Sequence, residues 1–220
     1  MIRVAVVDDQ PLVRAGFSTI LQHVADIASV GEAADGEAAV ALVLEALPDV
    51  VLMDVRMPRL DGIEATRRIL GDRRCADVHV IILTTFDLDD YVYAALQAGA
   101  SAFLLKDATP EALIEAIRIV AAGDALLAPT VTRRLIERFA DSAPIDASML
   151  DTLTDREREM LVGVARGLSN AELAAQMHVS HATAKTHVGR LLAKLHARDR
   201  AQLVIVAYES GLVRRGAPGG

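Results

Sequence analysis

Cysteine is almost absent from this 220-residue chain, and long apolar runs are absent altogether. Cys75 is the only cysteine, so no disulfide can form within the chain, and we expect a reducing compartment. No stretch reaches the roughly 20 apolar residues that a membrane-spanning helix needs. The first apolar run meets Asp8 too early for a signal peptide. We therefore expect a cytoplasmic protein with no membrane partner.

The chain also lacks an excess of positive charge. Its net charge is −7 and its isoelectric point is about 5.3, which by itself argues against a nucleic-acid partner. The average hides a division, because the net charge is −9 over residues 1–123, −1 over residues 124–150 and +3 over residues 151–220. This asymmetry predicts two domains with different partners.

Four short apolar runs each end at a single polar residue. The runs are rich in β-branched residues and alternate with stretches of helical periodicity, which is typical of buried strands in a parallel sheet. Such sheets bind ligands in the crevice outside the carboxyl ends of their strands. We therefore expect the terminal polar residues, with Asp9 beside the first of them, to converge on one site. The runs cover residues 4–7, 50–53, 80–83 and 102–105, and they end at Asp8, Asp54, Thr84 and Lys106.

The alternation of strand and helix predicts an α/β fold, a doubly wound five-stranded parallel sheet with helices on both faces. A fifth apolar segment, residues 27–30, supplies the remaining strand. Pro11 and Pro110 suit the first turn of a helix, and Gly99 suits the residue after one. The expected helices cover residues 11–24, 37–47, 63–70, 88–98 and 110–122.

The acids at the strand ends point to phosphoryl chemistry. An isolated pair of acids there is usually solvated or caps the next helix, but three neighbouring carboxylates raise one another's pKa unless a cation lies among them. Hard oxygen ligands of this kind suit Mg²⁺. A loop with proline and glycine follows Asp54, and we expect it to leave this carboxylate exposed as a nucleophile. Thr84 and Lys106 would then contact the transferred group.

Residues 1–123 contain a set of motifs in the order of a known domain: Asp8, Asp9, Asp54, Met57, Pro58, Gly62, Thr84, Ala98, Gly99, Ala100, Phe103, Leu105, Lys106 and Asp107. This segment resembles the flavodoxin-like receiver domain of two-component response regulators. The resemblance implies that a sensor histidine kinase phosphorylates Asp54, and that the domain catalyses only its own phosphoryl transfer and dephosphorylation. It further implies that the domain switches through Thr84 and Phe103. Other members of the family often have tyrosine at the position of Phe103, so any hydrogen bond from a phenol is absent here. The implied Mg²⁺ ligands are Asp8, Asp9, Asp54 and the backbone carbonyl of Arg56.

Two loop residues near the expected site have two interpretations. Arg56 and Phe86 flank the expected path of hydrolytic water. They either tune the lifetime of the phosphorylated state or are ordinary loop residues.

The rest of the chain is expected to form a linker and a small all-α domain. Residues 124–150 form the linker with a short helix over residues 129–140, and residues 214–220 form a flexible tail. Residues 151–213 hold four helical patterns, at 155–165, 170–177, 181–195 and 200–209, preceded by capping residues such as Thr154, Ser169 and Asp199. Two helices joined by a short turn, with basic residues on the second, predict a helix-turn-helix.

A charged helical face is most often only solvated surface, so local sequence carries the argument further. Residues 153–157, 167–174 and 179–188 resemble the LuxR-type DNA-binding domain. With the receiver, the whole chain is similar to a NarL/FixJ-family response regulator. The resemblance implies that helix 181–195 enters the major groove of promoter DNA and that helix 200–209 pairs two subunits. The DNA-binding residues expected are Ser180, Thr183, Lys185, Thr186, Gly189 and Arg190.

Two departures from the LuxR-type pattern bear on affinity. Ala171 replaces a lysine common in the family, and Gly189 stands where a larger side chain is frequent. Fewer side-chain contacts favour dependence on a homodimer, which joins two weak contacts into one tight one.

We therefore interpret the chain as a phosphorylation-dependent transcription regulator. One alternative is an atypical regulator switched by a ligand or partner protein without phosphorylation, although nothing in that mechanism would require all five strand-end residues. A less favoured alternative is a phosphatase with an aspartyl nucleophile, because no second acid follows Asp54 until Asp61.

Overall fold

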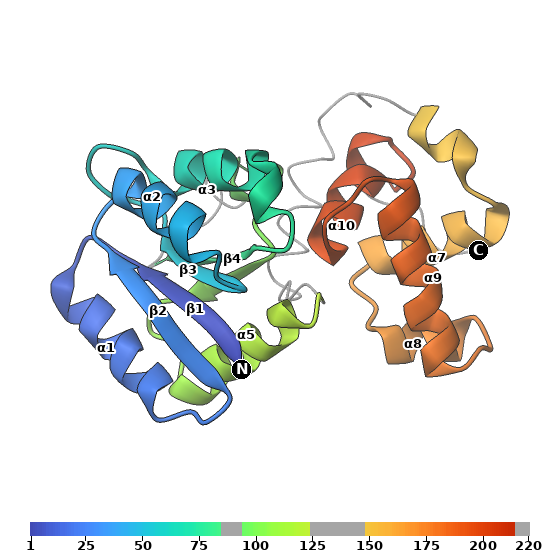
Figure 1. Cartoon of the computed structure of the whole chain (residues 1–220). Helices are drawn as coiled ribbons and strands as arrows, with labels where there is room; N and C mark the ends of the chain where they lie inside the picture. The colour runs from blue at the N-terminus through green and yellow to red at the C-terminus, as the bar shows by residue number, and fades with distance from the viewer. Residues whose placement is uncertain (85–93, 124–147, 214–220) are drawn as a thin grey trace. The chain divides into compact units, whose positions relative to one another are not determined.

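The chain folds into two compact units, Met1–Leu126 and Leu127–Gly220 (Figure 1). The computed structural model describes residues 1–84, 94–123 and 148–213. The expected linker helix at residues 129–140, the tail at 214–220 and Phe86 lie outside these ranges. Within them, no helix is long and apolar enough to cross a membrane.

The first unit holds a five-stranded parallel sheet in the order β2-β1-β3-β4-β5, which confirms the predicted fold class. Strands β1, β3 and β4 consist mainly of apolar residues and are buried along most of their length. At the sheet edge, β2 continues three residues past the predicted end at residue 30, because Gly31 and Glu32 still pair with β1 although they are not fully buried. The strands are β1 (Ile2–Val7), β2 (Ile27–Ala33), β3 (Val50–Asp54), β4 (His79–Thr84) and β5 (Ala102–Leu105).

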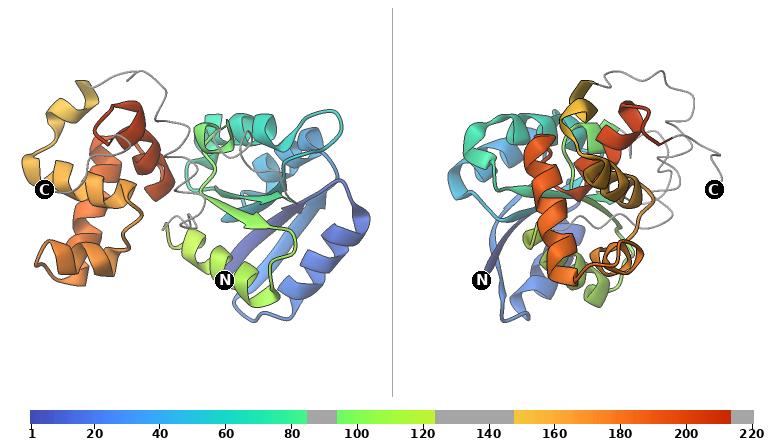
Figure 2. Two further views of the ribbon diagram at one scale, coloured as in Figure 1. Left: turned by 180° about the vertical axis from the view of Figure 1, so that it is seen from behind. Right: turned by 90° about the vertical axis from the view of Figure 1, so that its right-hand side faces the viewer.

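Helices cover both faces of this sheet. Figure 1 shows α1 (Pro11–Gln22) and α5 (Pro110–Ala121) on one face and α2 (Gly36–Ala46) and α3 (Gly62–Gly71) on the other, and the reverse view in Figure 2 agrees. The largest core cluster lies under α1 and α5, where their apolar faces meet the strands. Its members include Phe17, Leu21, Leu113, Ile117, Val120, Val4, Val6, Leu52 and Ile81.

The predicted helix ends agree with the structure within two residues. Pro11 and Pro110 occupy the first turns of α1 and α5 as expected. The helix expected over residues 88–98 begins outside the described part of the chain, where residues 94–97 are helical and Gly99 follows with φ of +107°. A short 3₁₀ helix, η1 (Arg73–Cys75), follows α3.

Two glycines allow the loop after β3 to pack closely. A Cβ at Gly62 would overlap the carbonyl oxygen of Asp54, and a Cβ at Gly36 would overlap that of Leu60. The Gly36 amide instead donates a hydrogen bond to the Leu60 carbonyl oxygen at 3.1 Å. These backbone contacts therefore fix the loop that follows β3, one end of it against Asp54 and the other against the start of α2.

The second unit is all-α, as predicted. A 3₁₀ helix, η2 (Ser148–Thr152), precedes α7 (Asp155–Ala165), α8 (Asn170–Gln176), α9 (His181–Lys194) and α10 (Arg200–Glu209). Thr154 and Ser169 each form a complete capping box with the glutamate three residues on. The apolar sides of the four helices form one core, which includes Met160, Leu161, Val164, Leu173, Leu191, Leu203 and Val204.

One ion pair joins the start of α7 to the end of α9. The Nζ atom of Lys194 lies 2.8 Å from Oε2 of Glu157, whose side chain is 9% exposed. The Lys194 ammonium, with hydrogen bonds from Thr154, lowers the pKa of Glu157 from 4.5 to about 2. Ionised Glu157 therefore both caps α7 and holds it to α9.

Gly62→Ala should destabilise the first unit by about 1–3 kcal/mol, because the added methyl group overlaps the Asp54 carbonyl and the loop must move. Gly71→Ala is a matched control, since nothing lies within 4 Å of a Cβ at this last residue of α3. Thermal unfolding of the full chain measures both. Equal stability of the two variants would contradict the close packing of this loop.

Glu157→Gln should destabilise the second unit by up to about 1 kcal/mol at pH 7, because it removes the negative charge that pairs with Lys194, whereas glutamine can still complete the capping box. Because the folded-state pKa is depressed, the contribution is complete above about pH 4.5 and is lost as the pH falls toward 2. Native-state hydrogen exchange of α7 and α9 amides should show the difference from wild type shrinking below about pH 5. Glu159→Gln, which affects an exposed pair with Arg156, is the control.

Candidate functional site

Three carboxylates meet at the carboxyl ends of β1 and β3. These strands are neighbours in the sheet, with Val7 opposite Met53, so Asp8 and Asp9 after β1 come next to Asp54 at the end of β3. Carboxylate oxygens of the three residues lie within 4.8 Å of one another. The Asp8 side chain accepts a hydrogen bond from the Gln10 amide at 2.9 Å. The predicted convergence of the strand ends therefore holds for all three acids.

Lys106 brings a fourth charge into this cluster. Its backbone amide donates to the carbonyl oxygen of Thr84 at 2.8 Å, which fixes the turn after β5 against the end of β4. Its Nζ atom lies 2.6 Å from Asp8 Oδ2 and 2.9 Å from Asp54 Oδ2. The lysine side chain is only 9% exposed. One ammonium group thus bridges two buried carboxylates.

Burial and ion pairing act against each other in this site. Burial raises the pKa of Asp54, and the Lys106 ammonium offsets this only in part. Burial also disfavours the charged form of Lys106, but the two carboxylates outweigh it, so the pKa of Lys106 is raised. The expectation of an exposed Asp54 is wrong, because its side chain is 8% exposed beside the lysine.

The acidic cluster has the donors that a hard divalent cation requires. Asp8 Oδ2 is fully buried, and apart from its ion pair with Lys106 no described residue directs a hydrogen bond at it. Asp9 remains exposed and offers oxygens from the solvent side. This acidic arrangement is the one typical of the Mg²⁺ site of receiver domains, and carboxylate oxygens suit that ion. Arg56 follows Asp54 by two residues in the adjoining loop.

The two expected switch residues lie on the strands next to Lys106. Thr84 is the last residue of β4, buried, and paired with Leu105 of β5. Phe103 lies in β5 opposite Ile82 and is 6% exposed. Thr84 therefore ends the strand that bonds the Lys106 amide, and Phe103 lies in the strand that Lys106 follows.

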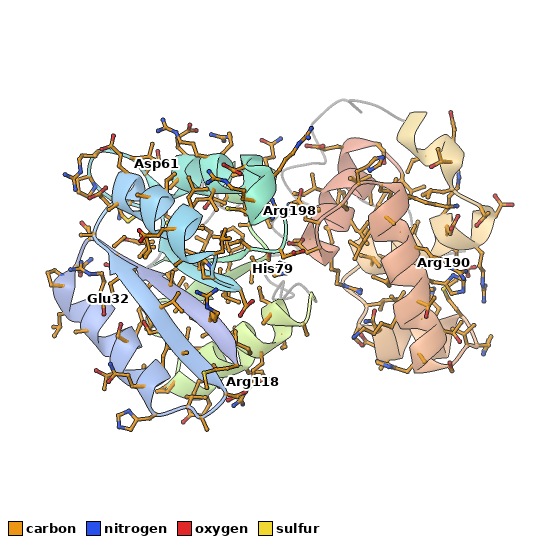
Figure 3. The ribbon with its side chains drawn as sticks, viewed as in Figure 1. Glu32, Asp61, His79, Arg118, Arg190 and Arg198 are labelled. Atoms are coloured by element: carbon orange, nitrogen blue, oxygen red, sulfur yellow. The ribbon has the colours of Figure 1, made fainter. Side chains whose placement is uncertain are left out.

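Sequence reasoning missed two arginines that support these loops. Arg14 of α1 donates to the carbonyl oxygen of Asp8 at 2.7 Å and lies 3.5 Å from Glu32, which Figure 3 marks on β2. Arg59, in the loop after Asp54, donates to Asp35, a buried residue that also caps α2. The local signal was the capping position of Asp35, since Arg59 lies 24 residues from Asp35 and Glu32 lies outside the helix that carries Arg14.

The second unit presents the predicted DNA-binding residues on α9 and at its N-cap. The Ser180 hydroxyl accepts the Thr183 amide at 3.1 Å and bonds the Thr183 hydroxyl at 2.8 Å. The Thr186 hydroxyl donates to Ala182 O at 2.9 Å. These hydroxyls stabilise the helix itself.

The basic residues of α9 are differently placed. Lys185 and Arg190 are exposed and form no side-chain ion pair or hydrogen bond with other residues in the described part of the chain. Figure 3 labels Arg190 on α9. A Cβ at Gly189 would have no described atom within 4 Å. Ala184, Val188 and Leu191 form the buried face of the helix. Helix α9 therefore has an exposed polar face on which two basic side chains have no partner among the described residues.

Comparison with known families divides the chain in the same way. Residues 4–118 match the response regulator receiver domain, and residues 151–207 match the bacterial regulatory proteins of the luxR family. The first match contains the acidic cluster and Lys106, and the second contains α8 and α9.

Curated relatives and a solved structure match along almost the whole chain. The chain is 44% identical over 215 residues to the uncharacterized transcriptional regulatory protein YxjL of Bacillus subtilis, covering 97% of this chain and 98% of that one. It is 38% identical over 213 residues to the response regulator protein VraR of Staphylococcus aureus, covering 97% and 99%. The crystal structure of the response regulator ChrA of a heme-sensing two-component system aligns with a TM-score of 0.52 at 38% identity, covering 96% and 98%. The chain therefore belongs to the NarL/FixJ family of two-component response regulators, DNA-binding transcription regulators rather than enzymes.

Proposed function

We propose that a sensor histidine kinase in the cytoplasm phosphorylates Asp54, and that phosphorylation promotes a homodimer that binds promoter DNA through α9. The observation that carries this proposal is the Lys106 ammonium, which lies within 3 Å of both Asp8 and Asp54, the two buried members of the cluster of three acids. An ammonium next to a carboxylate nucleophile is placed to neutralise an arriving phosphoryl group.

The transfer itself needs little from the protein beyond positioning. The P–N bond of the kinase phosphohistidine breaks as a P–O bond forms to the Asp54 carboxylate. Asp8, Asp9 and Asp54, with the carbonyl of Arg56, would hold Mg²⁺, which neutralises charge on the phosphoryl oxygens. Lys106 would supply a second positive charge from the carboxyl end of β5.

Phosphorylation would then redistribute the contacts of Lys106. The new group adds negative charge and acceptor oxygens to Asp54, so the ammonium would move from the carboxylates to the phosphoryl group. Because the Lys106 amide is bonded to the Thr84 carbonyl, the ends of β4 and β5 would respond together. The Thr84 hydroxyl and the buried Phe103 are the side chains placed to transmit this response.

DNA binding is proposed for the polar face of α9. Residues 151–220 have a net charge of +3, so a single copy should bind weakly and with strong salt dependence. Lys185 and Thr186 would contact bases, with Ser180, Thr183 and Arg190 nearer the backbone and Gly189 allowing close approach. A dimer formed through α10 would join two such contacts.

Intact-mass analysis of the full chain with Mg²⁺ and acetyl phosphate tests the proposal. Wild type should gain one acid-labile phosphoryl group, and Asp54→Asn should gain none, because an amide is not a nucleophile for this transfer. Asp61→Asn is the control, since Asp61 caps α3 in the same loop and asparagine also caps helices. An undiminished adduct in Asp54→Asn would reject this residue. No adduct on folded wild type would instead favour the ligand-switched alternative.

Lys185→Ala and Arg190→Ala should affect DNA binding in different ways. Loss of a base contact costs about 1–3 kcal/mol of discrimination, so Lys185→Ala should flatten base preference at one position per half-site. Arg190→Ala should weaken all sequences alike and lower the salt slope by about 1. Binding to a panel of operator point variants at several salt concentrations separates the two. Uniform loss in both variants would show that Lys185 contacts only the backbone.

A further inference from the structure

The turn between α8 and α9 is held in a strained conformation. The His178 amide donates to Ala175 O at 3.3 Å and the Val179 amide to Ala174 O at 3.0 Å, the pattern that ends a helix with a left-handed residue. Glycine usually occupies that position, whereas here His178 has φ of +53°. A side chain in this region costs about 1–2 kcal/mol, so the turn needs support from elsewhere.

That support comes from α7. One arm of the Arg156 guanidinium donates to the carbonyl oxygen of Met177, the residue that ends α8 immediately before the strained turn. The other arm donates to Glu159 Oε2 at 2.7 Å, which orients the group. A cation at the C-terminus of a helix is favoured by the exposed carbonyls there. Arg156 thus binds a carbonyl of this turn that accepts no amide hydrogen bond from the described residues.

Helix α8 is short and buries few side chains. It has seven residues, of which only Leu173 and Ala174 are buried, and its C-cap residue Met177 is buried as well. Its N-terminal end is fixed by the capping box of Ser169 and Glu172. Met177, three residues before the N-cap of α9 at Ser180, accepts the hydrogen bond from Arg156 of α7.

We infer that Arg156 is a positioning residue for DNA recognition: by binding the Met177 carbonyl it sets the α8–α9 turn and so the angle at which α9 meets base edges. The inference rests on the proposed binding of DNA through α9. Arg156 itself acts through Met177 and not through phosphate.

Arg158 provides a matched control in the same helix. Its guanidinium also donates to a backbone carbonyl, that of Leu150 in η2, at 2.7 Å. It also lies 3.7 Å from Asp151, away from the turn. Arg156→Met and Arg158→Met each remove one positive charge and one bond between an arginine and a carbonyl. Only the first removes a contact with the α8–α9 turn.

The experiment measures DNA binding by the full chain after treatment with a phosphodonor. Two duplexes are compared: one that wild type selects from a randomised pool, and one in which the selected sequence is scrambled. Arg156→Met should bind the selected duplex about fivefold more weakly than Arg158→Met, which corresponds to about 1 kcal/mol. On the scrambled duplex the two variants should bind alike, because non-specific binding follows charge. Hydrogen exchange at His178 and Val179 should accelerate only in Arg156→Met.

Three results would overturn the inference. Equal affinity of the two folded variants for the selected duplex shows that the turn needs no support from Arg156. A lowered salt slope in Arg156→Met alone shows direct phosphate contact, as expected instead for Arg190. If wild type selects no duplex at all, the proposed function fails and the inference with it. Should Arg156→Met not fold at the assay temperature, Arg156→Lys is compared with Arg158→Lys, and equal affinities of this pair likewise reject the inference.

Discussion

The first unit depends on one buried lysine. Lys106 Nζ contacts Asp8 at 2.6 Å and Asp54 at 2.9 Å, and all three side chains are less than a tenth exposed. Two buried carboxylates without a cation would be strongly destabilising, because an uncompensated charge in a low-dielectric interior is costly. The same arrangement makes Asp54 sensitive to added negative charge. Stability of the unmodified state therefore rests on this lysine, and so would the proposed response to phosphorylation.

Backbone carbonyls are the second recurring constraint. Gly62 lies against the carbonyl of Asp54, Arg14 donates to that of Asp8, and Arg156 donates to that of Met177. Each contact holds a loop or turn that carries a proposed functional residue at its end. Fixing the backbone in this way orients a side chain without occupying its polar atoms, which remain available for metal, phosphoryl group or DNA.

Local sequence predicts most of the fold and the centre of the site. The apolar runs that end at Asp8, Asp54, Thr84 and Lys106 are enough to predict the site, because parallel strands place their carboxyl ends at one edge of the sheet. Prediction failed where structure depends on distant partners. Strand β2 runs to Ala33 because it pairs with β1, although Gly31 and Glu32 interrupt its apolar run. The bond from Arg156 to Met177 spans 21 residues and leaves no periodic signal. The burial of Asp54 likewise depends on Lys106, 52 positions further along the chain.

We expect Lys106 to couple phosphorylation of Asp54 to dimerisation. The decisive variant is Lys106→Ala, with phosphoryl content measured by intact mass and oligomeric state by sedimentation of the same samples. The variant should still accept a phosphoryl group, because Mg²⁺ would retain most of the charge compensation, but should remain monomeric while phosphorylated wild type dimerises. If the phosphorylated variant dimerises as wild type does, Lys106 is not part of the switch.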